Sequence, residues 1–166
     1  MNIEIERKYL IKMPDICVLS KKYNIYEKSI LQTYLKCDSG TRRVRKVTAD
    51  GCSKYILTEK KRITNISCFE DEHEISFDEY LHMLNEADVS RAPVNKIRYV
   101  IEFKGHNIEI DKYDFWNNFA TLEVELQSEN EAFEIPQEIC IIKEVTDDKR
   151  FKNVNLAKVH NFDGLC

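Results

Sequence analysis

The chain is poor in the residues that break regular structure. It has four glycines and three prolines among 166 residues, and no repeat, low-complexity segment or linker is visible. This scarcity predicts regular elements joined by short turns. No C-x-x-C pair occurs among the six cysteines, which argues against a structural zinc site. We therefore expect the cysteines to be reduced, small hydrophobic residues with no chemical role.

Long hydrophobic runs are also missing. No stretch approaches the roughly 20 apolar residues that a membrane-spanning helix needs. Residues 1–8 are charged and lack the apolar run of a signal peptide. A basic excess is missing too, because the net charge is −4. Together these features predict a cytoplasmic protein with no membrane partner, and they do not favour nucleic acid as a partner.

What is present is a strand-rich pattern in a chain of the length of one domain, 1–166. Alternating segments predict strands and outnumber the helical ones, which indicates an α+β fold with a mainly antiparallel sheet. Hairpin turns are expected at Asp50-Gly51 and around Gly105. The predicted strands cover residues 3–6, 43–45, 55–60, 70–75, 96–103, 107–113 and 120–126. Helices are predicted from a capping box at Ser76 and Glu79, from Ser128 and Glu131, over 146–158, and weakly at Lys21 and Lys22.

Charged side chains recur two residues apart along these strands. Residues with that spacing share one face of a strand. In several strands the opposite face is apolar, as in residues 97–101 and 122–126. The pairs that share a face are Glu4, Glu6 and Lys8; Arg43 and Arg45; Thr58 and Lys60; Glu72 and Glu74; Lys96 and Arg98; Glu109 and Asp111; Glu123 and Glu125.

Most of these strands carry pairs of a single sign, either acidic or basic, and this pattern needs an explanation. For any single pair, a solvated face of an antiparallel sheet is the simpler interpretation. A solvated face usually mixes signs, however, because like charges side by side are destabilising. Clustered carboxylates suit hard cations such as Mg²⁺ or Mn²⁺, and clustered Arg and Lys suit phosphates. The pattern therefore indicates a metal–polyphosphate site, with no Ser–His or Cys–His grouping to suggest a covalent route.

Near its N-terminus the chain has Glu4-Ile5-Glu6-Arg7-Lys8, which resembles the E-x-E-x-K signature of the CYTH, or triphosphate tunnel metalloenzyme, superfamily. The similarity continues in order across nearly the whole chain. It includes 32–35, 43–45, 57–60, 72–75, 96–99, Asp111, 122–125, 144–153 and 156–157. The resemblance implies a closed antiparallel β-barrel of about eight strands, with a few covering helices and a C-terminal helix at the tunnel end. Residue patterns alone leave a β-sandwich open.

The resemblance also implies roles for individual residues. The expected metal ligands are Glu4, Glu6, Asp111, Glu123 and Glu125, holding two Mg²⁺ or Mn²⁺ ions. The expected phosphate-binding residues are Lys8, Arg43, Arg45, Lys60, Lys96, Arg98 and Arg150, the last on the C-terminal helix. Lys8, Lys60 and Glu74 are expected to act in catalysis, and Glu72 and Glu109 are further candidates. Two departures from the family pattern are Glu70, where many relatives have Arg, and Phe151, where relatives often have Tyr.

The resulting hypothesis is a metal-dependent triphosphatase whose substrate is inorganic tripolyphosphate. Class IV adenylate cyclase and thiamine or nucleoside triphosphatase activities stay open within the same fold, because fold does not settle function. A non-catalytic polyphosphate-binding module and an ordinary structural β-domain are alternatives of other classes. A homodimer is compatible with the resemblance.

Overall fold

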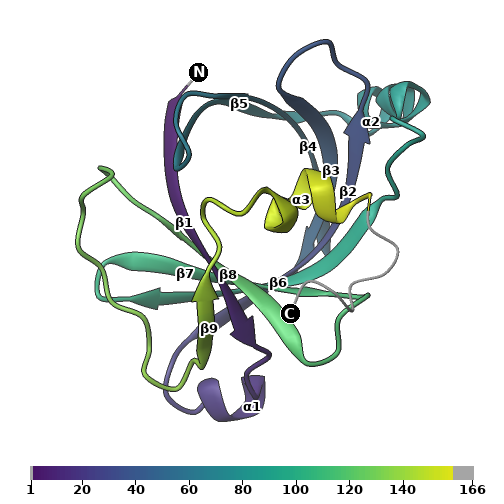
Figure 1. Ribbon diagram of the computed structural model, residues 1–166. Coiled ribbons are helices and arrows are strands. Elements are labelled where there is room, and N and C mark those ends of the chain that lie inside the picture. Colours follow the sequence, from purple (N-terminus) through teal and green to yellow (C-terminus); the bar gives the residue numbers. More distant parts are fainter. Residues whose placement is uncertain (1, 159–166) are drawn as a thin grey trace.

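The computed structural model describes residues 2–158, and an antiparallel β-barrel forms its centre (Figure 1). The strands are β1 (Asn2–Lys12), β2 (Ile25–Leu35), β3 (Thr41–Ala49), β4 (Cys52–Arg62), β5 (Ser67–Ile75), β6 (Val94–Phe103), β7 (His106–Tyr113), β8 (Phe119–Glu125) and β9 (Ile141–Glu144). Their order in the sheet is β5-β4-β3-β2-β6-β7-β8-β1-β9, and a further pairing between β1 and β5 closes the first eight strands into a barrel. The predicted closed barrel is confirmed, and the sandwich is excluded.

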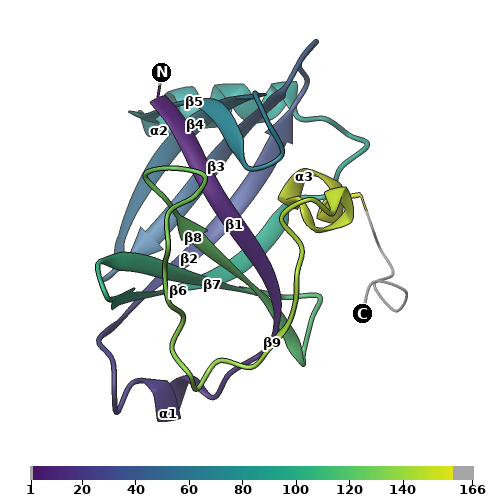
Figure 2. The ribbon, with the colours of Figure 1, turned by 60° about the vertical axis from the view of Figure 1, so that its left-hand side comes forward.

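Strand β1 forms the seam of the barrel. Along one edge it pairs with β8 over Glu6–Lys12. Along the other edge it pairs first with β5, where Glu4 lies opposite Cys68, and then with β9, where Leu10 lies opposite Lys143. Figure 2 shows β1 crossing the front of the barrel between these partners. Strand β9 is an addition outside the barrel, and the sequence pattern did not predict it because its four residues do not alternate.

Two hairpins have the tight turns that the sequence predicted. Asp50 and Gly51 join β3 to β4 with φ angles of 50° and 77°. Lys104 and Gly105 join β6 to β7 with φ angles of 47° and 83°. Two consecutive positive φ angles match the twist of antiparallel strands, which is why such turns fix the register of a hairpin. These registers set which side chains point into the barrel.

The hydrophobic core of this protein lies largely outside the barrel wall. The outward faces of β1, β6, β7 and β8 form one cluster, in which Ile101, Ile108, Ile110 and Leu122 are fully buried. Helix α1 (Ile16–Leu19) and the segment before β9 cover this cluster. On the opposite side, Tyr80 packs on Val44 and Leu57 from the outer faces of β3 and β4. The apolar faces of the strands therefore point outward, and the charged faces point inward.

One end of the barrel interior is closed by a third apolar cluster. Leu10, Tyr34 and Tyr113 point inward there and pack against Trp116 and Phe151. The chain that follows β9 crosses this end, and Figure 1 shows α3 (Asn153–Leu156) in front of the interior. A backbone hydrogen bond of 2.8 Å from Val145 to the carbonyl of Lys8 ties this segment to β1. The C-terminal segment thus lies at the tunnel end, as the resemblance implied.

The helix predictions are confirmed at one place and wrong at three. Helix α2 (Phe77–Met83) begins at the predicted capping box, in which Ser76 Oγ accepts from the backbone of Glu79 at 3.2 Å. It continues into a 3₁₀ turn, η1 (Leu84–Glu86). Ser128 and Glu131 form only a turn, and α1 ends before Lys21 and Lys22. The helix expected over 146–158 is instead a 3₁₀ turn, η2 (Lys149–Phe151), followed by the single turn of α3.

The last of these errors has an identifiable cause. Asp148 caps η2 by accepting from the backbone of Arg150, and Lys152 then adopts an extended conformation with a ψ angle of 133°. The acidic residues that favour a helix start are therefore used in a turn that places Phe151 in the apolar cluster. Among residues 2–158, no helix combines the length and hydropathy needed to span a membrane.

Candidate active site

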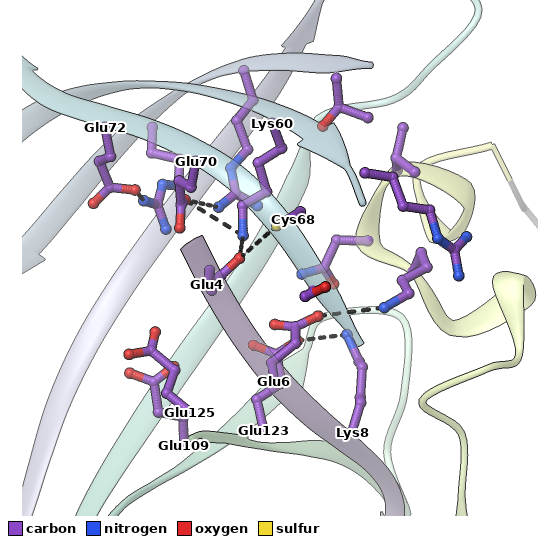
Figure 3. A pocket seen from close by; sticks show the side chains of 18 of the residues that line it. Glu4, Glu6, Lys8, Lys60, Cys68, Glu70, Glu72, Glu109, Glu123 and Glu125 are labelled. Atoms are coloured by element: carbon purple, nitrogen blue, oxygen red, sulfur yellow. Dashed lines mark hydrogen bonds and ion pairs between the residues drawn. The ribbon is translucent and has the colours of Figure 1, made fainter. Parts of the chain in front are cut away.

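A cavity of about 600 Å³ occupies the interior of the barrel. Residues of all eight barrel strands, of the adjoining loops and of the C-terminal segment line it, and Figure 3 shows its acidic side chains together with Lys8 and Lys60. Within the described residues, eight basic and seven acidic side chains contribute to the lining. The basic residues are Lys8, Lys28, Arg43, Arg45, Lys60, Arg62, Arg98 and Lys152; the acidic residues are Glu4, Glu6, Glu70, Glu72, Glu109, Glu123 and Glu125.

Charge is concentrated in the interior because the strands present their apolar faces to the outer clusters. Burying an ion is unfavourable unless a partner of opposite charge and hydrogen bonds compensate for lost water. The charged side chains of the cavity accordingly form two networks, one on β1, β6, β7 and β8 and the other on β1, β3, β4 and β5.

Arg98 and Asp111 form the centre of the first network. Arg98 binds both carboxylate oxygens of Asp111 at 2.7 Å and also contacts Glu123 at 2.7 Å and Glu109. Lys96 Nζ donates to the same Asp111, which is fully buried. Burial and the guanidinium of Arg98 lower the pKa of Lys96 to about 8. Every polar atom of the Asp111 carboxylate is therefore occupied by a side chain of the protein.

Lys8 extends this network to β1. Its Nζ lies 2.6 Å from Glu123, and the side chain is 2% exposed. Burial alone would lower the pKa of Lys8, but the carboxylate of Glu123 raises it above its ordinary value. In turn, burial opposes ionisation of Glu123, but Lys8 and Arg98 hold its pKa well below the ordinary range. Both groups are therefore charged at neutral pH.

The second network combines direct ion pairs with looser contacts around Glu70. Lys60 binds Glu4 and lies 3.4 Å from Glu70, while Arg43 lies 3.9 Å from the same Glu70 oxygen. Burial and the carboxylate of Glu4, opposed by Lys60, raise the pKa of Glu70 to about 7. Arg45 binds Glu72, and burial together with Arg43 lowers the pKa of Arg45 to about 10. In this half of the cavity, cations therefore lie close to other cations, and carboxylates lie close to other carboxylates.

The carboxylates of the cavity provide the donor atoms that a hard divalent cation prefers. Burial, and then the neighbouring Glu109, raise the pKa of Glu125, and burial also raises the pKa of Glu109. A cation near these groups would relieve that repulsion, so the residues fit Mg²⁺ or Mn²⁺. Among residues 2–158, no three His, Cys, Asp or Glu side chains already converge on one point, because most of the carboxylates contact Lys or Arg.

Eleven of the residues chosen from the sequence line the cavity together. They are Glu4, Glu6, Lys8, Arg43, Arg45, Lys60, Glu72, Arg98, Glu109, Glu123 and Glu125. Four others do not line it. Lys96 and Asp111 are buried behind it as an ion pair, with side chains 1% and 0% exposed. Glu74 is 59% exposed and pairs with Lys54, and Arg150 is 55% exposed and pairs with Asp148.

The sequence pattern did not point to three basic residues and one cysteine of the lining. Arg62 shares a face with Lys60 of the predicted strand over 55–60, and Lys28 shares a face with Gln32 of segment 32–35, so longer strands at these two places would have found them. Cys68 lines the cavity and its Sγ lies 3.1 Å from Glu4, although no role was given to any cysteine. Lys152 is in a segment without periodicity, and its Nζ lies 3.4 Å from Glu6.

Part of the lining is apolar. Ile30 lies opposite Val47 in the β2–β3 pairing, and Ile56 lies opposite Arg45 in the β3–β4 pairing. All three side chains line the cavity next to the arginines of β3. This apolar wall is a surface on which an uncharged part of a ligand can pack.

Comparison with known proteins identifies relatives of this chain. An inorganic triphosphatase of Acetivibrio thermocellus is 33% identical over 161 residues, covering 95% of both chains. The crystal structure of the inorganic triphosphatase NE1496 aligns with a TM-score of 0.58 at 28% identity, over 96% of this chain and 97% of the other. No family model matches the chain.

A more distant neighbour has the same fold. The structure of a Hippeastrum protein, HpAC1, described as a putative adenylyl cyclase with a dominant triphosphatase activity, aligns with a TM-score of 0.53. It is 13% identical over 75% of this chain and 80% of its own, and at this identity the similarity supports the fold alone.

Proposed function

Because the chain belongs to the triphosphate tunnel metalloenzyme (CYTH) superfamily, we propose that it is a metal-dependent triphosphatase acting on inorganic tripolyphosphate. The observation that carries the proposal is the lining of one cavity by both cations and carboxylates, in nearly equal numbers. Such a lining has little net charge to bind a polyanion by itself, whereas a polyanion together with divalent cations complements both sets.

Substrate binding is assigned to the basic side chains of the cavity. Arg43 and Arg45 project from β3, Lys60 from β4 and Lys8 from β1. Guanidinium groups bind phosphate oxygens in a bidentate manner, whereas each ammonium acts as a point charge. Their positions on different strands allow contacts to successive phosphoryl groups of one chain.

The metal is assigned to the carboxylates around the start of β1. Glu4 and Glu6 would hold it, together with Glu123 or Glu125 from β8. When bound, Mg²⁺ or Mn²⁺ neutralises phosphate oxygens and lowers the pKa of a coordinated water. Asp111 has no part in this assignment because, unlike Glu123, it does not line the cavity and is buried in ion pairs with Arg98 and Lys96.

The reaction is hydrolysis of the terminal phosphoanhydride bond. The oxygen of water forms a bond to the terminal phosphorus, and the bond from that phosphorus to the bridging oxygen breaks. The electron pair of that bond leaves with pyrophosphate, and the other product is orthophosphate. Lys8 and Lys60 stabilise the charge on the phosphate oxygens. Glu125 is assigned as acceptor of the water proton, since it lines the cavity and burial raises its pKa. Glu74 is not needed in this scheme.

The experiment is phosphate release from the purified protein with tripolyphosphate, in the presence of Mg²⁺, Mn²⁺ or EDTA. We expect release that requires the metal and stops in EDTA. Tight binding of tripolyphosphate without release under any metal would contradict a hydrolase and favour a polyphosphate-binding module.

A second candidate substrate class is favoured by the apolar wall of Ile30, Val47 and Ile56. An organic group attached to a triphosphate, such as a nucleoside or thiamine, could pack on that wall while its phosphates contact the arginines. Parallel assays with ATP and thiamine triphosphate separate the two. If ATP or thiamine triphosphate were hydrolysed faster than tripolyphosphate, that organic triphosphate would be the better substrate assignment.

A further inference from the structure

Glu70 has a position in the cavity that the proposed reaction does not use. It lies on β5, where its backbone pairs with Asn2 of β1 and with Lys60 of β4. Its side chain is 17% exposed and points into the cavity. A carboxylate at this position adds negative charge to the part of the site assigned to phosphate.

The contacts of Glu70 are with two phosphate-binding candidates at once. One oxygen, Oε1, lies 3.4 Å from Nζ of Lys60 and 3.9 Å from Nη2 of Arg43. These two cations come from neighbouring strands, β4 and β3, so the oxygen sits between them. An anionic oxygen between an ammonium and a guanidinium is the arrangement that a phosphate oxygen adopts with the same pair.

The contacts around Glu70 are looser than those of the other half of the cavity. Arg98 contacts Asp111 twice at 2.7 Å and Glu123 at 2.7 Å, and the paired Asp111 is fully buried. Lys60 and Arg43 contact Glu70 only at ion-pair distance, and Nε of Arg43 is buried with no hydrogen-bond partner. The carboxylate of Glu70 is therefore held between Arg43 and Lys60 by contacts that a better anion can replace.

We propose that Glu70 is an intramolecular competitor of the substrate, whose carboxylate occupies the seat of one phosphoryl group between Arg43 and Lys60 until the substrate displaces it. This inference rests on the proposed function. A phosphoryl group carries more charge and more oxygens than a carboxylate, so it replaces Glu70 when the rest of the triphosphate is also bound. Glu70 thus weakens the binding of every anion that uses this seat, and it re-enters the seat when product leaves.

The test is binding of tripolyphosphate in EDTA at about pH 8.5, measured by calorimetry. Glu70, whose pKa is raised to about 7, is ionised at this pH, and without metal no turnover occurs. Glu70→Gln keeps the size of the side chain and removes the competing charge. We expect it to bind at least about tenfold more tightly than the unaltered protein, the scale expected from a charge that contacts the binding seat. With metal present, the same variant should have a lower KM for tripolyphosphate and stronger inhibition by pyrophosphate.

Glu125→Gln is the matched control. It removes an equal charge from the same cavity but leaves Arg43 and Lys60 paired as before. If both variants bind equally more tightly, the effect is general electrostatics and the inference is wrong. Glu70→Ala, with circular dichroism to check folding, replaces the Gln variant if that variant does not fold.

The outcomes separate this inference from the proposed function. If the unaltered protein binds tripolyphosphate but never hydrolyses it, the proposed hydrolase fails and the competitor role of Glu70 still stands or falls by the binding comparison. If the protein hydrolyses tripolyphosphate and Glu70→Gln binds no more tightly, the competitor role alone is overturned. If neither protein binds tripolyphosphate in EDTA, and neither hydrolyses it with metal present, both are overturned.

Discussion

Arg98 and Asp111 form a bidentate ion pair in the wall of the barrel, with both bonds at 2.7 Å. The pair lies where a metal ligand was expected from the sequence. Because Asp111 is fully buried and Lys96 also binds it, its carboxylate compensates two cations that would otherwise be buried without a partner.

Asp111→Asn is therefore expected to destabilise the protein. Breaking a buried pair by removing one partner typically decreases the free energy of unfolding by about 3–5 kcal/mol. Urea unfolding measures the change, and Asp114→Asn, at an exposed position just past the end of the same strand, is the control. If the variant were as stable as the unaltered protein but needed a higher metal concentration for activity, Asp111 would be a metal ligand after all.

Arg45→Ala is expected to lower the turnover of tripolyphosphate by about 100-fold, the typical effect of removing one preorganised donor to a developing anion. Arg45 lines the cavity, whereas Arg42 on the same strand pairs outside it with Glu59 and Glu86. Steady-state phosphate release from Arg45→Ala and Arg42→Ala provides the comparison. Equal activity of the two variants would remove Arg45 from the phosphate site.

Glu4→Gln is expected to raise the Mn²⁺ concentration for half-maximal activity by about tenfold or more, because ligand sets lose affinity on this scale when disturbed. Glu59→Gln removes the same charge from β4 at a side chain that is 55% exposed and lies outside the cavity. Titration of activity with Mn²⁺, and direct Mn²⁺ binding followed by paramagnetic resonance, measure both variants. An unchanged Mn²⁺ dependence in Glu4→Gln would exclude Glu4 as a ligand.

Lys152→Ala and Arg150→Ala are expected to differ, although the sequence pointed to Arg150. Lys152 lines the cavity and contacts Glu6 at 3.4 Å, while Arg150 points to Asp148 and is 55% exposed. We expect KM for tripolyphosphate to rise several-fold, by about 1 kcal/mol of lost binding, in Lys152→Ala only. A raised KM in Arg150→Ala alone would restore the original assignment.

Glu70→Gln is expected to change how stability depends on pH. Burial and Glu4 raise the pKa of Glu70 from 4.5 to about 7 in the folded protein. The folded state then binds more protons than the unfolded state between these values, so Glu70 lowers stability as pH rises from 4.5 to 7. Compared with the unaltered protein, Glu70→Gln should be similar at pH 4.5 and more stable at pH 7.5. Urea unfolding at a series of pH values tests this, and parallel curves for the two proteins would contradict it.

Much of the barrel could be predicted because alternation records which face of a strand is buried. Ile108 and Ile110 alternate with Glu109 and Asp111, and the structure has the isoleucines outside and the acids inside. Alternation alone cannot tell a barrel from a sandwich, because both have two-faced strands. The prediction that the sheet closes into a barrel came from the resemblance to a known family.

Most of the predicted site residues that line the cavity lie on strands, but the sequence did not show where a strand leaves the cavity. Glu74 shares a face with Glu72, but it lies near the end of β5 and is exposed, and alternation carries no information about where a strand leaves the cavity. Lys152 was missed because an extended residue between two short turns has no periodic signal. The burial of Lys96 behind the cavity depends on the neighbouring strands, which the local sequence does not specify.

The seam at β1 has a consequence for synthesis of the chain. Strand β1 is synthesised before the other strands in the structure, and it pairs with β5, β8 and β9. Glu6 therefore cannot pair with Glu125, nor Tyr9 with Glu144, until most of the chain has been synthesised. The hairpins from β2 to β5 and from β6 to β8 join neighbours in sequence, and such local pairings form before contacts that close long loops. Among the barrel strands, β1 and β8 pair residues that are farthest apart in sequence, so we expect this pairing to complete the cavity lined by Glu4, Glu6 and Lys8 in the last step of folding.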